Sequence, residues 1–114
     1  MTTTFSPTRT EHDLIGDAEV PAHVYWGVHT MRAAEHFQLT DQKLADNPFL
    51  IAALARVKQA AARANLQLGL LDRTRAEAID QACGRVAAGE FNEQFILDPI
   101  QGGAGTSTNM NANE

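Results

Sequence analysis

The sequence has one cysteine, Cys83, among its 114 residues. A lone cysteine cannot form an internal disulfide, which excludes a fold held together by such cross-links. The N-terminal stretch has neither a basic start nor an apolar block, which argues against a secretory signal. We therefore expect a reducing, cytoplasmic setting.

Basic residues and long apolar runs are also scarce. Nine Lys and Arg stand against fourteen Asp and Glu, giving a formal charge of −5 and a pI near 5.2. This balance argues against nucleic acid or an anionic membrane surface as a partner. The longest apolar run, residues 49–55, is far shorter than the roughly 18 to 20 residues of a membrane helix, so none is expected.

Large apolar side chains are fewer than the 44% hydrophobic content suggests, because nineteen residues are alanine. Alanine favours helix but buries little apolar surface. The length fits one small, mainly α-helical domain. We expect its helices to pack against a partner or further chain as well.

The N-terminal region divides into a tail and the start of a domain. Residues 1–10 are rich in Thr and Ser and predict a flexible tail, with the domain spanning 11–114. Short extended pieces on either side of Gly16 and Asp17 predict a small β-hairpin that ends at Pro21.

Three helices are predicted in the body of the chain. The first spans residues 26–37, and the second begins at Asn47-Pro48, because an Asx residue before proline favours a helix start. The third starts at Thr74, which forms a capping box with Glu77, or at the competing Asp72, and ends near Gly89. The second and third are joined by a short loop and should be antiparallel. Their apolar stripes are Leu50, Leu54, Val57, Ala61, Ala64 and Leu68, and Ala76, Ile79, Cys83 and Val86.

Residues 91–100 fit either a short helix or an extended connector, and both alternatives stay open. The Gly-rich segment that follows, residues 101–105, precedes the hydroxyl-rich run Thr106-Ser107-Thr108. Such a run can present backbone N–H groups and hydroxyls to an anion such as a carboxylate. The alternative is a loop that starts a helix, with Thr106 or Ser107 as its N-cap.

The residues that several other kinds of site require are missing from this sequence. A phosphate-binding loop needs a lysine where Thr106 stands, and a dinucleotide fingerprint needs a third glycine. His29 and His36 would lie about 10 Å apart along a helix, too far for one metal ion, so no metal is expected. Cys83 lies on an apolar stripe and is expected to be an inert buried thiol.

Two long motifs give the sequence a specific resemblance to the aspartase/fumarase superfamily, and within it to the N-terminal domain of the aspartate ammonia-lyases. They are GDAEVPA (16–22) with YWGVHTMR (25–32), and QGGAGTSTNMNANE (101–114). The similarity runs from about Glu11 to Glu114. Class II fumarases are similar in the same region, but typically read GAQT at 27–30, serine at Ala104 and TQSN at 106–109. At these positions the sequence matches the aspartases better, whereas Trp26 is closer to the fumarases.

The resemblance implies a fold, an activity and a site. The fold is the mainly α, small N-terminal domain of the fumarase/aspartase fold with a short β-hairpin. The activity is reversible deamination of L-aspartate to fumarate and ammonia by a homotetramer whose active sites each draw on three subunits, with no cofactor and no metal. The implied site has Thr106 binding the substrate β-carboxylate, beside Ala104, Gly105 and Ser107.

The catalytic base of such enzymes lies on a mobile Gly-Ser-Ser loop, which the resemblance places downstream of this sequence. No catalytic residue is therefore expected in the chain, which should be inactive by itself. Two alternatives remain: a class II fumarase, in which water replaces ammonia, and a non-enzymatic helical interaction module whose glycine loop only turns the chain.

Overall fold

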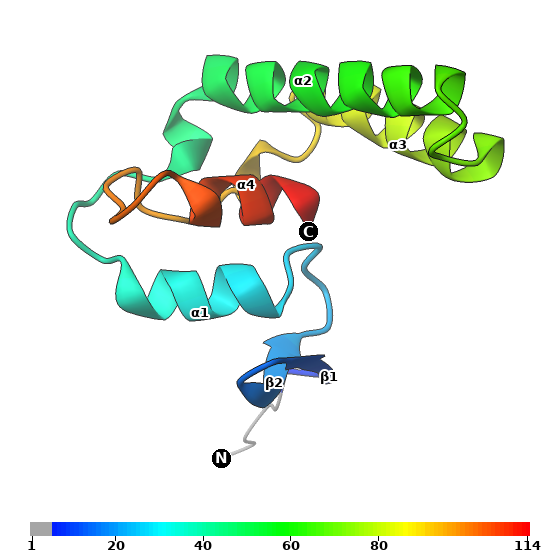
Figure 1. Ribbon diagram of the computed structural model, residues 1–114. Helices are drawn as coiled ribbons and strands as arrows, with labels where there is room; N and C mark the ends of the chain where they lie inside the picture. The colour runs from blue at the N-terminus through cyan, green and yellow to red at the C-terminus, as the bar shows by residue number, and fades with distance from the viewer. Residues whose placement is uncertain (1–5) are drawn as a thin grey trace.

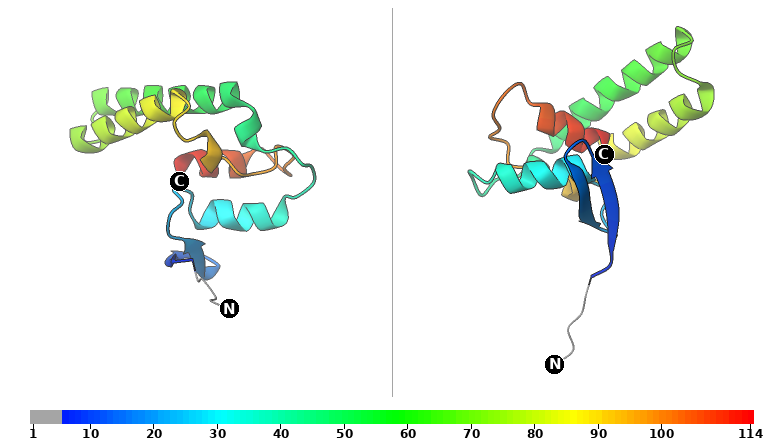
Figure 2. Two further views of the ribbon diagram at one scale, coloured as in Figure 1. Left: turned by 180° about the vertical axis from the view of Figure 1, so that it is seen from behind. Right: turned by 60° about the horizontal axis from the view of Figure 1, so that its bottom comes forward.

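The computed structural model describes residues 6–114 as four α-helices with a β-hairpin at the N-terminal end (Figure 1). Helix α4 lies between α1 on one side and the α2–α3 pair on the other, and this arrangement is visible from both sides (Figures 1 and 2). In chain order the elements are β1 (Thr8–Asp13), β2 (Gly16–Pro21), α1 (Val28–His36), η1 (Leu44–Asp46), α2 (Pro48–Gln67), α3 (Arg73–Ala87), η2 (Asn92–Gln94) and α4 (Thr106–Asn113).

The predicted hairpin is present, but its turn and its start differ from the prediction. The turn lies at residues 14–15, because the Asp13 carboxylate accepts hydrogen bonds from the amides of Ile15 and Gly16 at 3.0 and 3.1 Å. Strand β1 begins at Thr8, which pairs with Pro21, so residues 8–10 belong to the strand and not to a tail. The first part of the predicted tail, residues 1–5, lies outside the described residues.

Two carboxylates cap the N-terminus of α1. Glu11 accepts a hydrogen bond from the first amide of the helix at 3.0 Å, and Glu114 accepts from the amides of His29 and Thr30 at 3.0 and 2.8 Å. A Cβ on the preceding Gly27 would lie 2.5 Å from a Glu114 oxygen and 2.7 Å from a Glu11 oxygen. The absence of a side chain at Gly27 therefore lets both carboxylates reach the helix.

Helices α2 and α3 form the expected antiparallel pair. Asn47 caps α2 by accepting a hydrogen bond from Leu50 at 3.2 Å, as predicted. The N-cap of α3 is Asp72, which accepts from Arg75 at 3.0 Å, so the Thr74 capping box is wrong and the competing residue is confirmed.

The buried face of α2 is not the predicted one. The buried residues of this helix are Ile51, Ala55, Gln59 and Ala62, whereas Val57 and Leu68 of the predicted stripe are about 70% exposed. Gln59 faces α3 because its amide donates to the Asp80 carboxylate at 2.8 Å and to the Asp80 carbonyl at 3.2 Å. The buried face of α2 therefore includes the polar Gln59 and is not the predicted apolar stripe.

The segment left open by the sequence, residues 91–100, forms the short helix η2 and then an extended connector. Phe95 and Leu97 of the connector are buried in the core with Ala33, Leu44 and Ile51. The carbonyls of Leu97 and Phe95 accept hydrogen bonds from the amides of Leu44 and Ala45, at 2.8 and 3.0 Å. The connector is thus fixed just before the glycine-rich loop.

Candidate functional site

The glycine-rich loop leads directly into α4. Gly103 and Gly105 have φ values of +91° and +82°, in the left-handed region that other residues rarely adopt. Gly105 is the N-cap of α4 and Thr106 is its first residue, with no side chain capping the helix. The interpretation of Thr106 or Ser107 as the N-cap is therefore wrong, and their hydroxyls are not used for capping.

The first amides of α4 differ in their partners. The amide of Thr108 donates to Gln101 Oε1 at 3.2 Å, and the amide of Asn109 donates to the Gly105 carbonyl at 3.2 Å. Within residues 6–114, the amides of Thr106 and Ser107 have no hydrogen-bond partner. Unpaired amides at the positive end of a helix dipole attract anions.

The four predicted site residues lie together across this junction. Ala104 and Thr106 are exposed, while Gly105 and Ser107 are half-buried. Sequence reasoning missed Lys58 of α2, whose ammonium donates to the Asn109 side chain at 2.6 Å within the first turn of α4. A lone lysine in an alanine-rich helix gave no signal, because only the packing of α2 beside α4 brings it here.

Ser107 also lines a cavity of about 360 Å³ between the hairpin, α1 and α4. Arg32 lies in its wall and is held by Asp13, with Nε 2.7 Å from one carboxylate oxygen and Nη2 3.2 Å from the other. This guanidinium is the main reason why the pKa of Asp13 lies below its usual value. His29 and His36, which were not expected to share a metal ion, both line this cavity.

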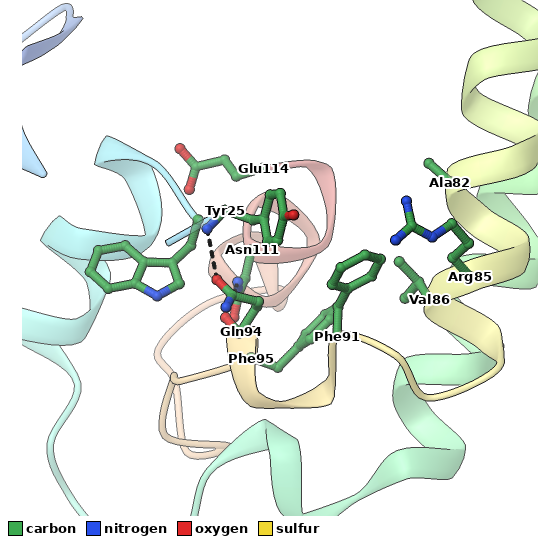
Figure 3. Close-up of a pocket in the computed structure, with 10 residues that line it drawn as sticks. Tyr25, Ala82, Arg85, Val86, Phe91, Gln94, Phe95, Asn111 and Glu114 are labelled. Carbon is green, nitrogen blue, oxygen red and sulfur yellow. Dashed lines mark hydrogen bonds between the residues drawn. The ribbon is translucent and has the colours of Figure 1, made fainter. Parts of the chain in front are cut away.

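A second cavity, of about 230 Å³, lies at the opposite end of α4 (Figure 3). The rings of Tyr25 and Phe91 meet edge to face at 5.1 Å, with the Arg85 guanidinium 4.8 Å from the Phe91 ring centre. Asn111 is 4% exposed, and its Oδ1 has no hydrogen-bond partner among the described residues. This cavity is separate from the glycine-rich loop.

Three further expectations concern the Cys83 thiol, metal-binding groups and membrane-spanning helices. Cys83 is buried on α3, and burial raises the pKa of its thiol, which keeps it protonated at neutral pH. Residues 6–114 contain no group of three or more His, Cys, Asp or Glu placed to hold a metal ion. None of the helices in this part of the chain combines the length and apolar character needed to cross a bilayer.

Comparison with known families decides the family. The family model described as Lyase matches residues 16–114, which is most of the chain. The chain belongs to this lyase family. The resemblance read from the two sequence motifs is thereby confirmed.

Relatives in this lyase family include aspartate ammonia-lyases and a fumarase. The aspartate ammonia-lyase of Pseudomonas aeruginosa is 56% identical over 107 residues, which cover 94% of this chain and 23% of that protein. The aspartate ammonia-lyase of Helicobacter pylori is 53% identical over 93% of this chain. A class II fumarate hydratase of Halobacterium salinarum is 50% identical over the same share. The chain spans less than a quarter of the length of these relatives.

Solved structures confirm the predicted fold class, a mainly helical domain of the fumarate lyase fold with a short hairpin. A crystal structure described as fumarate lyase:delta crystallin from Brucella melitensis matches with a TM-score of 0.92 and 48% identity, over 94% of this chain and 25% of that one. A class II fumarase from Schistosoma mansoni matches with a TM-score of 0.88 and 33% identity, over 95% of this chain and 22% of that one.

Proposed function

We propose that this chain is the N-terminal portion of a lyase that reversibly converts L-aspartate to fumarate and ammonia. Its role is to bind the substrate β-carboxylate at the start of α4, through Thr106 with Gly105, Ala104 and Ser107. The observation that carries the proposal is the pair of unpartnered amides at Thr106 and Ser107, directly after two positive-φ glycines. The high identity to aspartate ammonia-lyases supports the choice of substrate.

The chemistry explains why such donors are useful. A base removes a proton from the carbon beside the β-carboxylate, and the electron pair left there forms the double bond as the carbon–nitrogen bond breaks and ammonia leaves. Negative charge grows on the carboxylate while the proton departs. Fixed amides and a hydroxyl that bind this charge more tightly than the starting carboxylate lower the barrier.

The complete site needs more than this chain. We place the base and the remaining substrate-binding residues in the part of the parent protein that follows residue 114, since the relatives are more than four times as long. The parent is proposed to be a cytoplasmic homotetramer, with residues 8–114, which include the whole hairpin, as its N-terminal domain. It needs no cofactor or metal for this chemistry, and the 114 residues alone should be inactive.

A class II fumarase is the second candidate, and the 50% identity to the Halobacterium salinarum enzyme favours it. Both enzymes bind a four-carbon dicarboxylate, and the two reactions differ in the leaving group, which is ammonia or water. Assays of the full-length parent with L-aspartate and with L-malate separate the two. Turnover of L-malate alone would favour the fumarase.

The variant Thr106→Ala of the full-length parent tests the site. Loss of one donor to the developing charge should lower kcat/KM for L-aspartate by roughly 10²-fold. The matched control is Thr74→Ala, an exposed threonine in the first turn of α3, which should leave kcat/KM unchanged. A loss of less than about threefold for Thr106→Ala would remove this residue from the site.

A further inference from the structure

The side chain of Gln101 bridges the two ends of the glycine-rich loop. Its Nε2 donates to the carbonyl of Asp98 at 3.0 Å, and its Oε1 accepts from the amide of Thr108 at 3.2 Å. One amide side chain thus connects the backbone before the loop to the third residue of α4. A glutamine can do this because its amide group is both donor and acceptor.

The loop between these two points has little else to hold it. A Cβ added at Gly102, Gly103 or Gly105 would meet no atom within 4 Å, so the fold does not pack against the loop at these positions. Ala104, in the middle, is exposed. The position of the loop therefore depends on its ends, where Gln101 makes its two hydrogen bonds.

The Asp98 end is anchored firmly in the fold. Asp98 is 5% exposed. Its carboxylate accepts hydrogen bonds from the amides of Leu39 and Ile100, both at 2.8 Å, and from the Thr40 hydroxyl at 3.1 Å. These contacts tie it to the segment between α1 and η1. Gln101 therefore positions the start of α4 relative to a fixed point of the core.

We propose that Gln101 is a positioning residue for substrate binding. Its side-chain oxygen accepts the hydrogen bond of the Thr108 amide and so holds the first turn of α4 in one orientation. The amides of Thr106 and Ser107 remain the free donors of this turn. This inference rests on the proposed function, since it assumes that those donors bind the β-carboxylate. Gln101 itself does not touch the substrate.

The test is a double-mutant cycle in the full-length parent with Gln101→Met and Thr106→Ala. Methionine keeps the length of the side chain but can make neither hydrogen bond. Misplacing the donors should lower kcat/KM for L-aspartate by about 10-fold. Because Gln101 acts through the Thr106 loop, the double variant should lose less than the product of the two single losses.

Two measurements separate positioning from a merely structural role. The inhibition constant for succinate, a dicarboxylate without an amino group, should rise in Gln101→Met, while the thermal unfolding temperature stays within a few degrees of the wild type. Gln67→Met, at the exposed end of α2, is the matched control and should change neither. Losses that multiply in the cycle, or a Gln101→Met activity within about twofold of wild type, would overturn the inference.

If Gln101→Met does not fold, Gln101→Glu decides. The introduced carboxylate can accept from the Thr108 amide but cannot donate to the Asp98 carbonyl. Because this carboxylate stays ionised at neutral pH, Gln101→Glu should lower kcat/KM for L-aspartate, and wild-type activity of this variant contradicts the inference. Should Thr106→Ala be fully active, the proposed function fails; should only the Gln101 variants be fully active, the positioning role alone fails.

Discussion

The starts of α1 and α4 are two helix N-termini with different partners. At α1, the Glu114 carboxylate accepts hydrogen bonds from the amides of His29 and Thr30 and from the Thr30 hydroxyl. At α4, the amides of Thr106 and Ser107 have no partner among residues 6–114. Both helices follow a glycine and carry hydroxyl residues in the first turn. The comparison teaches that α1 already shows how this fold holds a carboxylate, with the carboxylate supplied by the protein itself.

The two glycines before these helices have different reasons to be glycine. Gly27 needs space for two carboxylates, whereas Gly105 needs its positive φ and has open space around it. One glycine therefore serves the packing of the fold, and the other serves the path of an exposed loop. Substitutions at the two ends should accordingly affect stability at α1 and activity at α4.

The largest effect on stability is expected for Gly27→Ala. The added methyl group would overlap oxygens of Glu114 and Glu11, so the hydrogen bonds at the start of α1 would break or lengthen. We expect the local opening free energy to fall by about 2 kcal/mol. Hydrogen exchange of the His29 and Thr30 amides in the full-length parent measures it.

The control for this prediction is Gly102→Ala in the glycine-rich loop. The added Cβ meets nothing within 4 Å, and Gly102 does not have a positive φ. Its stability should be unchanged. Equal destabilisation by the two substitutions would show that the carboxylates at α1 are not the reason for Gly27.

A smaller effect is expected for Glu114→Gln. This change removes the charge and replaces one acceptor oxygen with an NH2 group that cannot accept, so one amide hydrogen bond to α1 is lost and the other loses its charge-assisted strength. The start of α1 should lose about 1 kcal/mol, again seen as faster exchange of the His29 and Thr30 amides. Exchange as slow as in the wild type would mean that the charge of Glu114 does not stabilise α1.

The smallest effect is a pH dependence confined to acid conditions. Burial acts to raise the pKa of Asp98, but hydrogen bonds from Ile100, Thr40 and Leu39 outweigh it and lower the pKa below its usual value. A lowered pKa stabilises the fold above the unfolded value of about 3.9, and this contribution is lost as the pH falls through the folded pKa. Exchange protection of the Thr40 and Ile100 amides should persist down to about pH 4. Loss of protection already above pH 5 would contradict this assignment.

Local signals predicted much of the fold. The N-cap at Asn47, the antiparallel helix pair and the stop at Gly89 depend on residues close in sequence, and the structure confirms them. The buried face of α2 could not be predicted this way, because it includes the polar Gln59, which donates a hydrogen bond to Asp80 of the next helix. The turn of the hairpin was misplaced because the Asp13 side chain moves it to residues 14–15.

The segment proposed as the binding site could also be picked out from residues close in sequence. The glycines and hydroxyls are consecutive in the sequence, so Ala104 to Ser107 could be identified as one segment. Lys58 and its partner Asn109 are 51 positions apart in the sequence, and Glu114 and Thr30 are 84 positions apart. No local pattern indicates such contacts, and only the packing of α4 between α1 and α2 creates them.

The most direct test of the carboxylate site is a crystal structure of the full-length parent with a bound four-carbon dicarboxylate such as succinate. The account predicts a carboxylate oxygen within hydrogen-bond distance of the Thr106 hydroxyl and of the amide of Thr106 or Ser107. A dicarboxylate bound elsewhere, with the start of α4 in contact only with solvent, would contradict it.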